Sequence, residues 1–416
     1  MRKPWKVLAC GSAVLVSLGT SVAAREAIDV AGYVQIVLRS HPAGRLKAAF
    51  EEAARAERKA AKWQVSDPVV EYSRGRAHPN EAPSLLGTET SLSVSQTIPW
   101  PGTYSAGVRA GARAGDVLNA EGTASRWEIE IAARRAFTVL VTARALLEID
   151  EATEADARSL RDLVARRTEL GETRESDRIR TAVEWMRQRR LLDASRREAE
   201  TAEVVVRTLA VEALPRPLAI RAEPPADLPP QSRESLVARL LERNPLLLAS
   251  RADAERQRAL ASRAKQARIP DLDVTVFRDK ELDKASNGIA VGLRVPLWNA
   301  NRGEVARSDA SLNIALASAE RKRLDLLAEL EERLKDIEVA GAQVQALDQE
   351  ILPSAGESLR LSRRSYEEGE TSLLDLLDAQ RTLRDTQREA AESRLAMALA
   401  VTDIQRLVGP DFDPWR

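Results

Sequence analysis

An internal duplication governs how this sequence can fold. The segment that starts SHPAGRLKAAFEEAA at Ser40 parallels the segment that starts RNPLLLASRADAERQ at Arg243. Farther along, SVSQTIPWPGTYSAG parallels AVGLRVPLWNANRG, and ELGETRESD parallels EEGETSLLD. The two Gly-Glu-Thr steps begin at Gly171 and Gly369, which lie 198 positions apart. A repeat of this kind indicates that one structural unit occurs twice in the chain.

Shifts in composition mark the boundaries of the two units. Residues 1–24 have a basic start, an apolar run and a small-residue ending, which is the pattern of a secretory signal peptide. Residues 214–231 contain six prolines, which predict an extended connector. We therefore expect a first structural repeat over 25–213 and a second structural repeat over 232–416.

Cys10 leaves an alternative open at the N-terminus. The residues VLAC that end at Cys10 loosely resemble a lipoprotein cleavage box. The apolar run before this cysteine is short, however, and it continues past the cysteine. We expect Cys10 to be removed with the signal peptide, and lipidation of Cys10 is the alternative.

Charge balance and rare residue types argue against several functions. The chain has 63 basic and 63 acidic side chains, so no net positive field favours nucleic acid as a partner. With two histidines and one cysteine, we expect neither a metal site nor a cofactor. The sequence contains no nucleophile elbow, phosphate-binding loop or cluster of metal ligands, so we do not expect an enzyme.

Each half shows the same order of predicted elements. A proline in the first turn opens a helix that ends near residue 65 or 267. A strand, a polar loop and a second strand follow. Two further helices close each unit, and they are predicted over 103–167, 174–212, 300–366 and 372–408. At ~1.5 Å per residue the longer ones reach about 100 Å, which is too long for a globular core.

A seven-residue repeat predicts how the last helix packs. Apolar or small residues recur every seven positions in two registers that are three residues apart: Leu376, Leu383, Ala390, Met397 and Ile404, and Ala379, Thr386, Ser393, Ala400 and Leu407. A sustained repeat of this kind is a coiled-coil seam. Its many small residues suit the close packing of several helices into a tube wall.

The four predicted strands alternate between apolar and polar residues. They are DPVVEYS, TSLSVSQTI, DLDVTVF and GIAVGLRVP. A soluble sheet packed on helices is one explanation of this pattern. The strands are also about as long as tilted strands that cross a bilayer, where only a closed barrel satisfies the strand edges. Since small barrels need about eight strands, several chains would have to contribute four strands each.

These features together resemble the TolC-type outer-membrane efflux channels, the outer membrane efflux protein family. The resemblance is carried by the tandem repeat, by SQTIPWPG after the second strand, and by SYEEGETSLLDLLDAQRTL near the C-terminus. It implies a mostly α-helical fold with a small β part, built from a duplicated helix–strand–strand–long helix–helix unit. It further implies a homotrimer whose α-helical tube is continued by a twelve-stranded transmembrane β-barrel.

The same resemblance implies a function and partners. It predicts the outer-membrane channel of a tripartite efflux system, located in the cell outer membrane with a long periplasmic extension. Its partners would be outer-membrane lipid, a periplasmic adaptor (membrane fusion protein) and an inner-membrane pump of the RND type. The SQTIPWPG turn is most similar to the heavy-metal branch of the family, so heavy-metal ions are the first candidate substrate. The alternatives are a drug-efflux or type I secretion channel of the same family, and a periplasmic coiled-coil adaptor protein.

Four residues match the periplasmic gate of this family. Asp375 and Asp378, one helical turn apart, match aspartates that form rings at the constriction, although two solvated helix acids would have the same spacing. Asp177 occupies the corresponding place in the first half, where its second partner is Arg180 in place of an acid. Tyr366 matches a latch tyrosine.

Two glycines and a threonine complete the predicted site. Thr371 stands where the resemblance leads us to expect the basic partner of Tyr366. Gly171 and Gly369 fall where the long helices turn back, and the resemblance implies that these tips dock onto the adaptor. An ordinary helix C-cap is the alternative explanation for both glycines.

Overall fold

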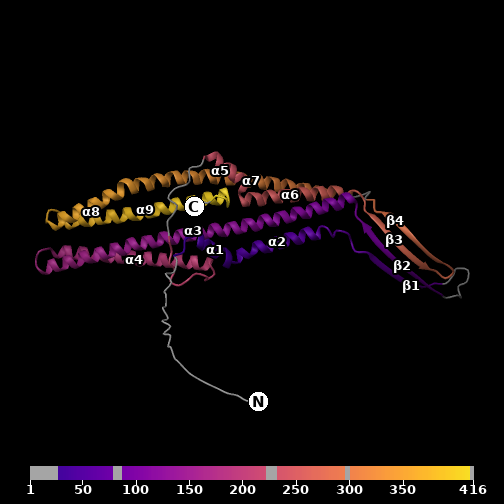
Figure 1. The fold of residues 1–416 in the computed structure, drawn as a ribbon, viewed down its shortest axis with the longest axis horizontal. Helices are drawn as coiled ribbons and strands as arrows, with labels where there is room; N and C mark the ends of the chain where they lie inside the picture. The colour runs from indigo at the N-terminus through magenta and orange to yellow at the C-terminus, as the bar shows by residue number, and fades with distance from the viewer. Residues whose placement is uncertain (1–26, 78–86, 222–231, 296–299, 413–416) are drawn as a thin grey trace, which may run out of the picture.

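The computed structural model describes residues 27–77, 87–221, 232–295 and 300–412. The predicted signal peptide and Cys10 lie outside these residues. Figure 1 shows an elongated molecule in which long helices run side by side and a narrow sheet extends from one end. The fold is mostly helical with a small antiparallel part, as expected.

The same order of elements occurs in each half. The first half contains α1 Val30–Ser40, α2 Pro42–Ala60, β1 Val69–Ala77, β2 Gly87–Ile98, α3 Pro101–Glu169 and α4 Glu175–Leu209. The second half contains α5 Arg233–Arg243, α6 Pro245–Gln266, β3 Leu272–Lys280, β4 Ala285–Leu293, α7 Arg302–Ala346, η1 Leu347–Ile351, α8 Leu352–Glu367 and α9 Leu373–Val408. The predicted domain boundaries remain predictions.

Two short helices, α1 and α5, were not predicted. Each begins at a residue type that commonly caps helices. The Asp29 carboxylate accepts a hydrogen bond from the Gly32 N–H at 2.7 Å, and the Ser232 hydroxyl accepts one from the Ser235 N–H at 3.2 Å. These caps were the signal in the sequence that would have located both helices.

The predicted long helix of the second half contains one irregular turn. Leu347–Ile351 forms a π-helical segment between α7 and α8. Pro353 follows it, and a proline inside a helix lacks an N–H and its ring crowds the carbonyl group four residues earlier. The wider π turn accommodates this conflict. No helix in the described part of the chain combines the length and apolar character that a membrane-spanning helix requires.

The helices pack as the seven-residue repeat predicts. Of the ten residues named in the two registers of α9, all are buried except Leu383 and Ser393, which are partly buried. A second apolar cluster joins α1, α3 and α4, where the Tyr33 ring stacks on Phe137 at 5.4 Å. The Tyr33 hydroxyl donates a hydrogen bond to the Val206 carbonyl oxygen at 2.9 Å.

The start of the predicted connector is packed, in contrast to the extended segment that we expected. Leu214 and Leu218 are buried in the cluster of α1, α3 and α4. Ile220 forms an isolated parallel bridge with Ile28. Apolar side chains between the prolines explain the difference, because burying them stabilises this part of the chain. The proline-rich remainder, 222–231, lies outside the described residues.

The four strands form one antiparallel sheet in the order β1-β2-β3-β4. The register places Val70 beside Val94, Val94 beside Val276, and Val276 beside Ile289. As a result, most of the apolar residues of the four strands share one face. The opposite face is mostly polar, apart from Val69 and Phe277. There the Ser95 and Thr275 hydroxyls hydrogen-bond at 2.9 Å. In the described part of the single chain, no strand pairs with the outer edges of β1 and β4.

Candidate functional site

Two glycine turns form the helical end of the molecule, opposite the sheet (Figure 1). Gly171 and Gly369 have φ angles of 80° and 82°, in the left-handed region that favours glycine. The Glu172 N–H donates to the Arg167 carbonyl, and the Glu370 N–H donates to the Ser365 carbonyl, both at 2.8 Å. Together with the bonds from the glycine N–H groups, these are Schellman motifs. The glycines therefore end their helices, and any docking role comes in addition to that.

The structure gives Asp375 a local task that the sequence interpretation did not include. Ser372 and Asp375 form a capping box at the start of α9. The Asp375 carboxylate accepts hydrogen bonds from the Ser372 hydroxyl and the Ser372 N–H, at 2.7 and 3.1 Å. These bonds lower the pKa of Asp375 below its ordinary value. Asp378, one turn farther along, is exposed.

The structure brings Tyr366 and Asp177 together across the two halves. Tyr366 is partly buried against the apolar cluster of Leu373, Leu377 and Val164. Burial raises the pKa of Tyr366, while the nearby Arg167 guanidinium lowers it and the Asp177 carboxylate raises it.

The basic group near Tyr366 thus comes from the end of α3, and not from the position of Thr371. Asp177 also forms an ion pair with Arg180, one turn farther along α4, at 3.6 Å. The Thr371 hydroxyl is buried and has no hydrogen-bond partner among the described residues.

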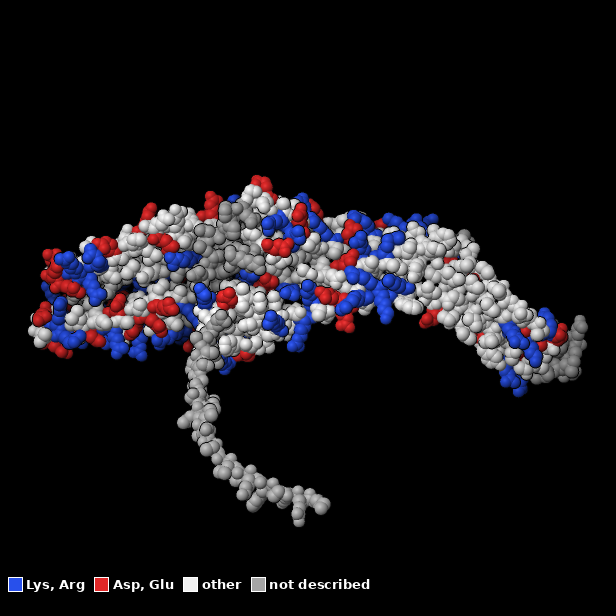
Figure 2. Space-filling model, viewed as in Figure 1, with Lys and Arg blue, Asp and Glu red and all other residues white. Residues whose placement is uncertain are grey.

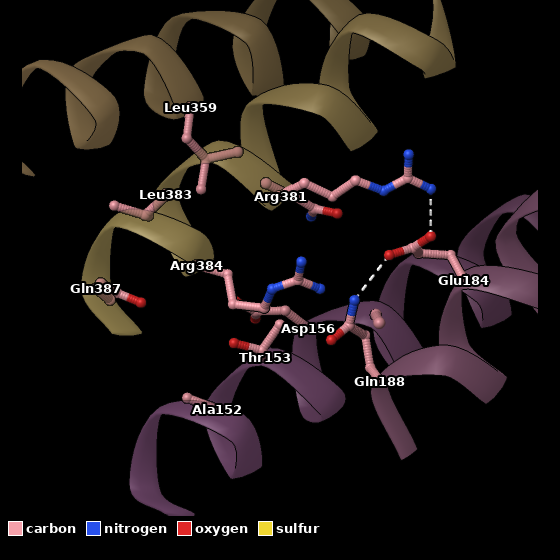
Figure 3. Close-up of a pocket in the computed structure, with 12 residues that line it drawn as sticks. Ala152, Thr153, Asp156, Glu184, Gln188, Leu359, Arg381, Leu383, Arg384 and Gln387 are labelled. Atoms are coloured by element: carbon pink, nitrogen blue, oxygen red, sulfur yellow. Dashed lines mark hydrogen bonds and ion pairs between the residues drawn. The ribbon is translucent and has the colours of Figure 1, made fainter. Parts of the chain in front are cut away.

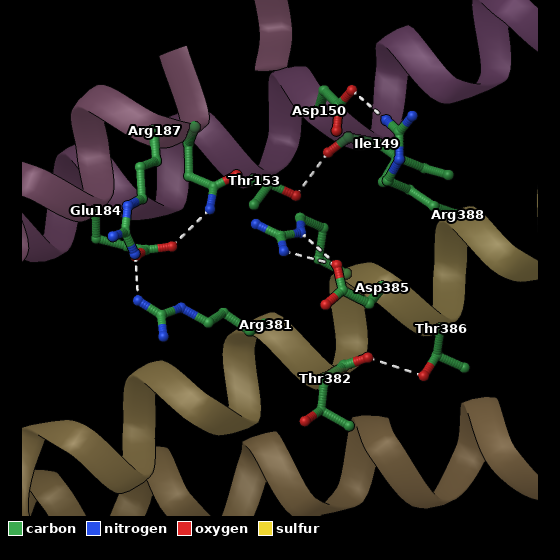
Figure 4. A network of polar contacts seen from close by, with 12 residues as sticks. Ile149, Asp150, Thr153, Glu184, Arg187, Arg381, Thr382, Asp385, Thr386 and Arg388 are labelled. Carbon is green, nitrogen blue, oxygen red and sulfur yellow. Dashed lines mark hydrogen bonds and ion pairs between the residues drawn. The ribbon is translucent and has the colours of Figure 1, made fainter. Parts of the chain in front are cut away.

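A row of ion pairs between the two helical hairpins was not predicted. Arg381 of α9 pairs with Glu184 of α4, and Arg388 pairs with Asp150 of α3 at 2.6 Å (Figure 4). Glu184 and Asp150 are buried, with only 5% and 2% of their surface exposed. The Ser195 hydroxyl also donates to Asp150. Figure 4 shows the arginines of α9 reaching across toward α3 and α4.

A small cavity lies beside this row. Its volume is ≈ 120 Å³, and it is lined by side chains from α3, α4, α8 and α9, among them Asp156, Gln188, Leu359 and Arg384 (Figure 3). Burial raises the pKa of Glu184, but hydrogen bonds from Arg381 and Gln188 outweigh it, and the net shift is downward. Glu184 therefore stays ionised at neutral pH and holds Arg381 at the boundary between the hairpins.

The spacing of the arginines could have revealed the row. Arg381 and Arg388 are seven residues apart, like the seam residues beside them. Their acidic partners lie in the other half of the sequence, and only the packing of the hairpins identifies them. No group of three or more histidine, cysteine, aspartate or glutamate side chains in the described ranges is arranged to hold a metal ion.

Comparison with known proteins shows which family this chain resembles in sequence and which structures share its fold. The model of the outer membrane efflux protein family matches residues 236–410. This segment of the chain belongs to the outer membrane efflux protein family. The cobalt-zinc-cadmium resistance protein CzcC of Cupriavidus metallidurans is 29% identical over 184 residues, or 44% of each protein. The chain thus matches less than half the length of this curated relative.

Solved structures share the fold over nearly the whole chain. The crystal structure of CusC superposes with a TM-score of 0.79 and 16% identity, covering 91% of this chain and 92% of CusC. The CmeC outer membrane channel of Campylobacter jejuni superposes with a TM-score of 0.77 and 16% identity, covering 93% and 87%. The fold shared with CusC and CmeC therefore extends beyond the segment that the family model matches.

Proposed function

We propose that this chain is the outer-membrane channel of a tripartite efflux system. It would conduct substrate from an inner-membrane pump and a periplasmic adaptor to the exterior. The observation that carries this function is an outer-membrane efflux protein fold whose sheet exposes an uncovered apolar face. Membership of residues 236–410 in the efflux family supports it.

The apolar face of the sheet fits contact with lipid. Val70, Ile289 and Val291 are 63%, 71% and 65% exposed, and no helix among the described residues covers them. Figure 2 shows the body of the sheet almost free of charge, with charged side chains again at its far end. From Leu92 to Ile98 the apolar band runs ~20 Å along the strand at ~3.3 Å per residue, which is of the same order as the ~25 Å apolar band of outer-membrane barrels before the tilt of the strand shortens its height.

The free edges of β1 and β4 support assembly into a closed barrel. An unpaired edge in lipid leaves backbone N–H and C=O groups without partners, which is costly. Four strands from each of three chains would pair edge to edge into a twelve-stranded barrel with room for a passage. The long helices would then continue the barrel as a periplasmic tube of three protomers.

The helical end would carry the gate and the docking site. Around a threefold axis, Asp378 would form an acidic ring, with Asp375, Asp177 and Tyr366 close to it. The Gly171 and Gly369 turns would present the tips to the adaptor. Acidic rings of this kind attract cations and repel anions.

The proposed cargo is a heavy-metal ion. The name of the cobalt-zinc-cadmium resistance protein supports this choice, and the match to it covers 44% of this chain. Drug efflux and type I secretion by the same fold are the alternatives. A periplasmic adaptor would not need the exposed apolar face of the sheet.

A deletion strain tests this function. We expect it to become sensitive to cobalt, zinc or cadmium salts, and the intact gene to restore growth. Purified protein should conduct ions across a planar bilayer. If the protein conducts ions but the deletion strain is sensitive only to dyes and antibiotics, the cargo would be drugs and not metal ions. The absence of conduction would contradict a channel.

A further inference from the structure

The apolar face of the sheet ends in basic residues at its far end. The four described strands contain four arginine and lysine residues, all exposed, which we call the basic cluster: Arg74, Arg76, Arg278 and Lys280. Because side chains alternate along a strand, Arg74 shares the face of Tyr72, and Arg278 shares the face of Val276. Figure 2 shows arginine and lysine side chains gathered at the end of the sheet that lies away from the helices. The apolar band therefore passes directly into the basic cluster.

The acidic residues of the strands lie on the opposite face. Alternation places all of them there, on the side of the Ser95 and Thr275 hydroxyls: Glu71, Glu89, Asp273 and Asp279. On that face the Ser91 hydroxyl donates a hydrogen bond to the Asp279 carboxylate at 2.5 Å. The sheet thus separates its charges, with every strand cation on the apolar side.

No acid in the described part of the chain neutralises the basic cluster. The ion pairs at the sheet join Lys284 to Glu281 in the turn after β3, and Arg294 to Asp273 just after β4. None of the four cluster residues takes part in an ion pair with a described residue. Since cations that lie close together repel each other, the cluster gains from an anionic partner.

Protection of the sheet edges explains only part of this arrangement. Charged residues on an edge strand prevent unwanted edge-to-edge pairing, and β1 is an edge strand in the described part of the single chain. Strand β3, however, pairs with β2 on one side and with β4 on the other. Arg278 and Lys280 therefore need another explanation.

The register brings basic residues of two strands to either side of one threonine. Thr90 lies between Arg74 on β1 and Lys280 on β3, as the direct neighbour of each. The Cα atoms of Arg74 and Lys280 are then ~10 Å apart, which is within the combined reach of their side chains. Arg278 lies two residues from Lys280 on the same face. Guanidinium, ammonium and hydroxyl groups all donate hydrogen bonds, and a phosphate group accepts several at once.

We propose that the basic cluster binds the phosphate groups of lipopolysaccharide, the glycolipid of the outer leaflet of outer membranes. In the orientation proposed above, the helices lie in the periplasm, so the far end of the sheet reaches the outer leaflet. The apolar band contacts the acyl chains of the lipid, and the cluster holds its phosphates where the band ends. This inference rests on the proposed outer-membrane channel and specifies the lipid that it contacts.

Lipid binding by the full-length protein in neutral detergent tests the cluster. Arg278→Gln with Lys280→Gln should weaken the binding of fluorescent lipopolysaccharide about tenfold, as the loss of one charge-assisted contact would. A chelator keeps divalent cations from bridging phosphates to the acids of the sheet. Lys62→Gln with Arg268→Gln is the matched control, because it removes an exposed lysine and an exposed arginine at the helical end of the sheet. An equal loss in both variants, or no loss in the first, would overturn the inference.

Three further measurements separate a phosphate contact from a change in folding. Circular dichroism of the glutamine variant should show unchanged helix and strand signals. Arg278→Lys with Lys280→Arg keeps both charges and should bind lipopolysaccharide like the wild type. Wild-type protein should bind dephosphorylated lipopolysaccharide about as weakly as the glutamine variant binds the intact lipid. Loss of binding in the charge-keeping variant, or equal binding of the dephosphorylated lipid, would contradict recognition of phosphate by charge.

A phospholipid competitor distinguishes the two leaflets. Phosphatidylglycerol carries a single phosphodiester, whereas lipopolysaccharide carries several phosphate groups, so phosphatidylglycerol should displace lipopolysaccharide poorly. Displacement at equal concentration would assign the cluster to anionic phospholipids and overturn the choice of lipopolysaccharide.

Conductance in a planar bilayer keeps this inference apart from the proposed function. A wild-type protein that conducts ions, but binds lipopolysaccharide no better than the glutamine variant, would contradict only the lipid contact. A wild-type protein that does not conduct would contradict the channel itself.

Discussion

At the residue scale, the two acids of the predicted gate have different surroundings. Asp375 is part of the capping box of α9, whereas Asp378 is exposed and free of that task. The sequence interpretation treated them as a pair with a shared function. In the structure only Asp378 can be replaced without removing a helix cap, so it is the cleaner probe of the gate.

Replacement of Asp378 tests the acidic ring. In a planar bilayer, Asp378→Asn should reduce the cation preference of the channel and its block by multivalent cations, because three carboxylates would leave the constriction. Reversal potentials in a salt gradient measure this change. Asp325→Asn, on the exposed surface of α7, removes the same charge and should leave selectivity unchanged. Equal selectivity of wild type and Asp378→Asn would exclude Asp378 from the gate.

Replacement of Asp375 should weaken the start of α9. Because the folded-state pKa of Asp375 is lowered, its stabilising effect is present above the unfolded pKa and is lost as the pH falls through the folded value. Asp375→Ala should therefore lower the melting temperature at pH 7 more than near pH 3. A difference that does not depend on pH would contradict the role of the carboxylate in the cap.

At the scale of elements, the choice of substitution at the glycine turns decides whether an experiment tests the conformation of the turn or its docking onto the adaptor. Valine at Gly369 would cost about 1–2 kcal/mol in the left-handed region, and loss of function could then reflect a damaged turn. Asparagine tolerates this conformation. Because no described atom outside the adjoining residues lies within 4 Å of a Cβ built at Gly369, the side chain of this asparagine would project into open space.

Gly369→Asn should therefore keep the oligomer and reduce efflux, because the added side chain would obstruct the adaptor. Pull-down of the adaptor and an efflux assay would measure the two effects. Unchanged adaptor binding would mean that Gly369 serves only to end α8.

The ion pairs between hairpins give a prediction at the same scale. Arg381→Met should destabilise the packing of α9 against α4 by about 2 kcal/mol, because it leaves Glu184 buried without its main partner. Replacing Glu184 by Gln as well should recover part of the loss. Since the pKa of Glu184 is lowered in the folded state, the difference between wild type and Arg381→Met should shrink as the pH falls below about 4. Thermal unfolding at several pH values above and below about 4 measures this difference in stability. An equal loss of stability at every pH would contradict an ion pair between Arg381 and Glu184.

At the scale of the whole molecule, local patterns predicted most of the elements, except α1 and α5, and missed contacts between elements. Alternation located the strands, and the seven-residue repeat identified the buried face of α9. The pair of Arg381 with Glu184 joins residues 197 positions apart, so no local pattern could identify it. The packing of Leu218 and the position of Arg167 near Tyr366 likewise depend on helices that meet only in the folded chain.

The number of chains in the purified particle tests the central claim most directly. An outer-membrane channel built from four strands per chain requires closure of the β1 and β4 edges by neighbouring copies. Native mass spectrometry in detergent should give three chains of 45.7 kDa, less the mass of any signal peptide removed. Circular dichroism should retain both helix and strand signals. A folded monomer with intact helices and strands would contradict the account.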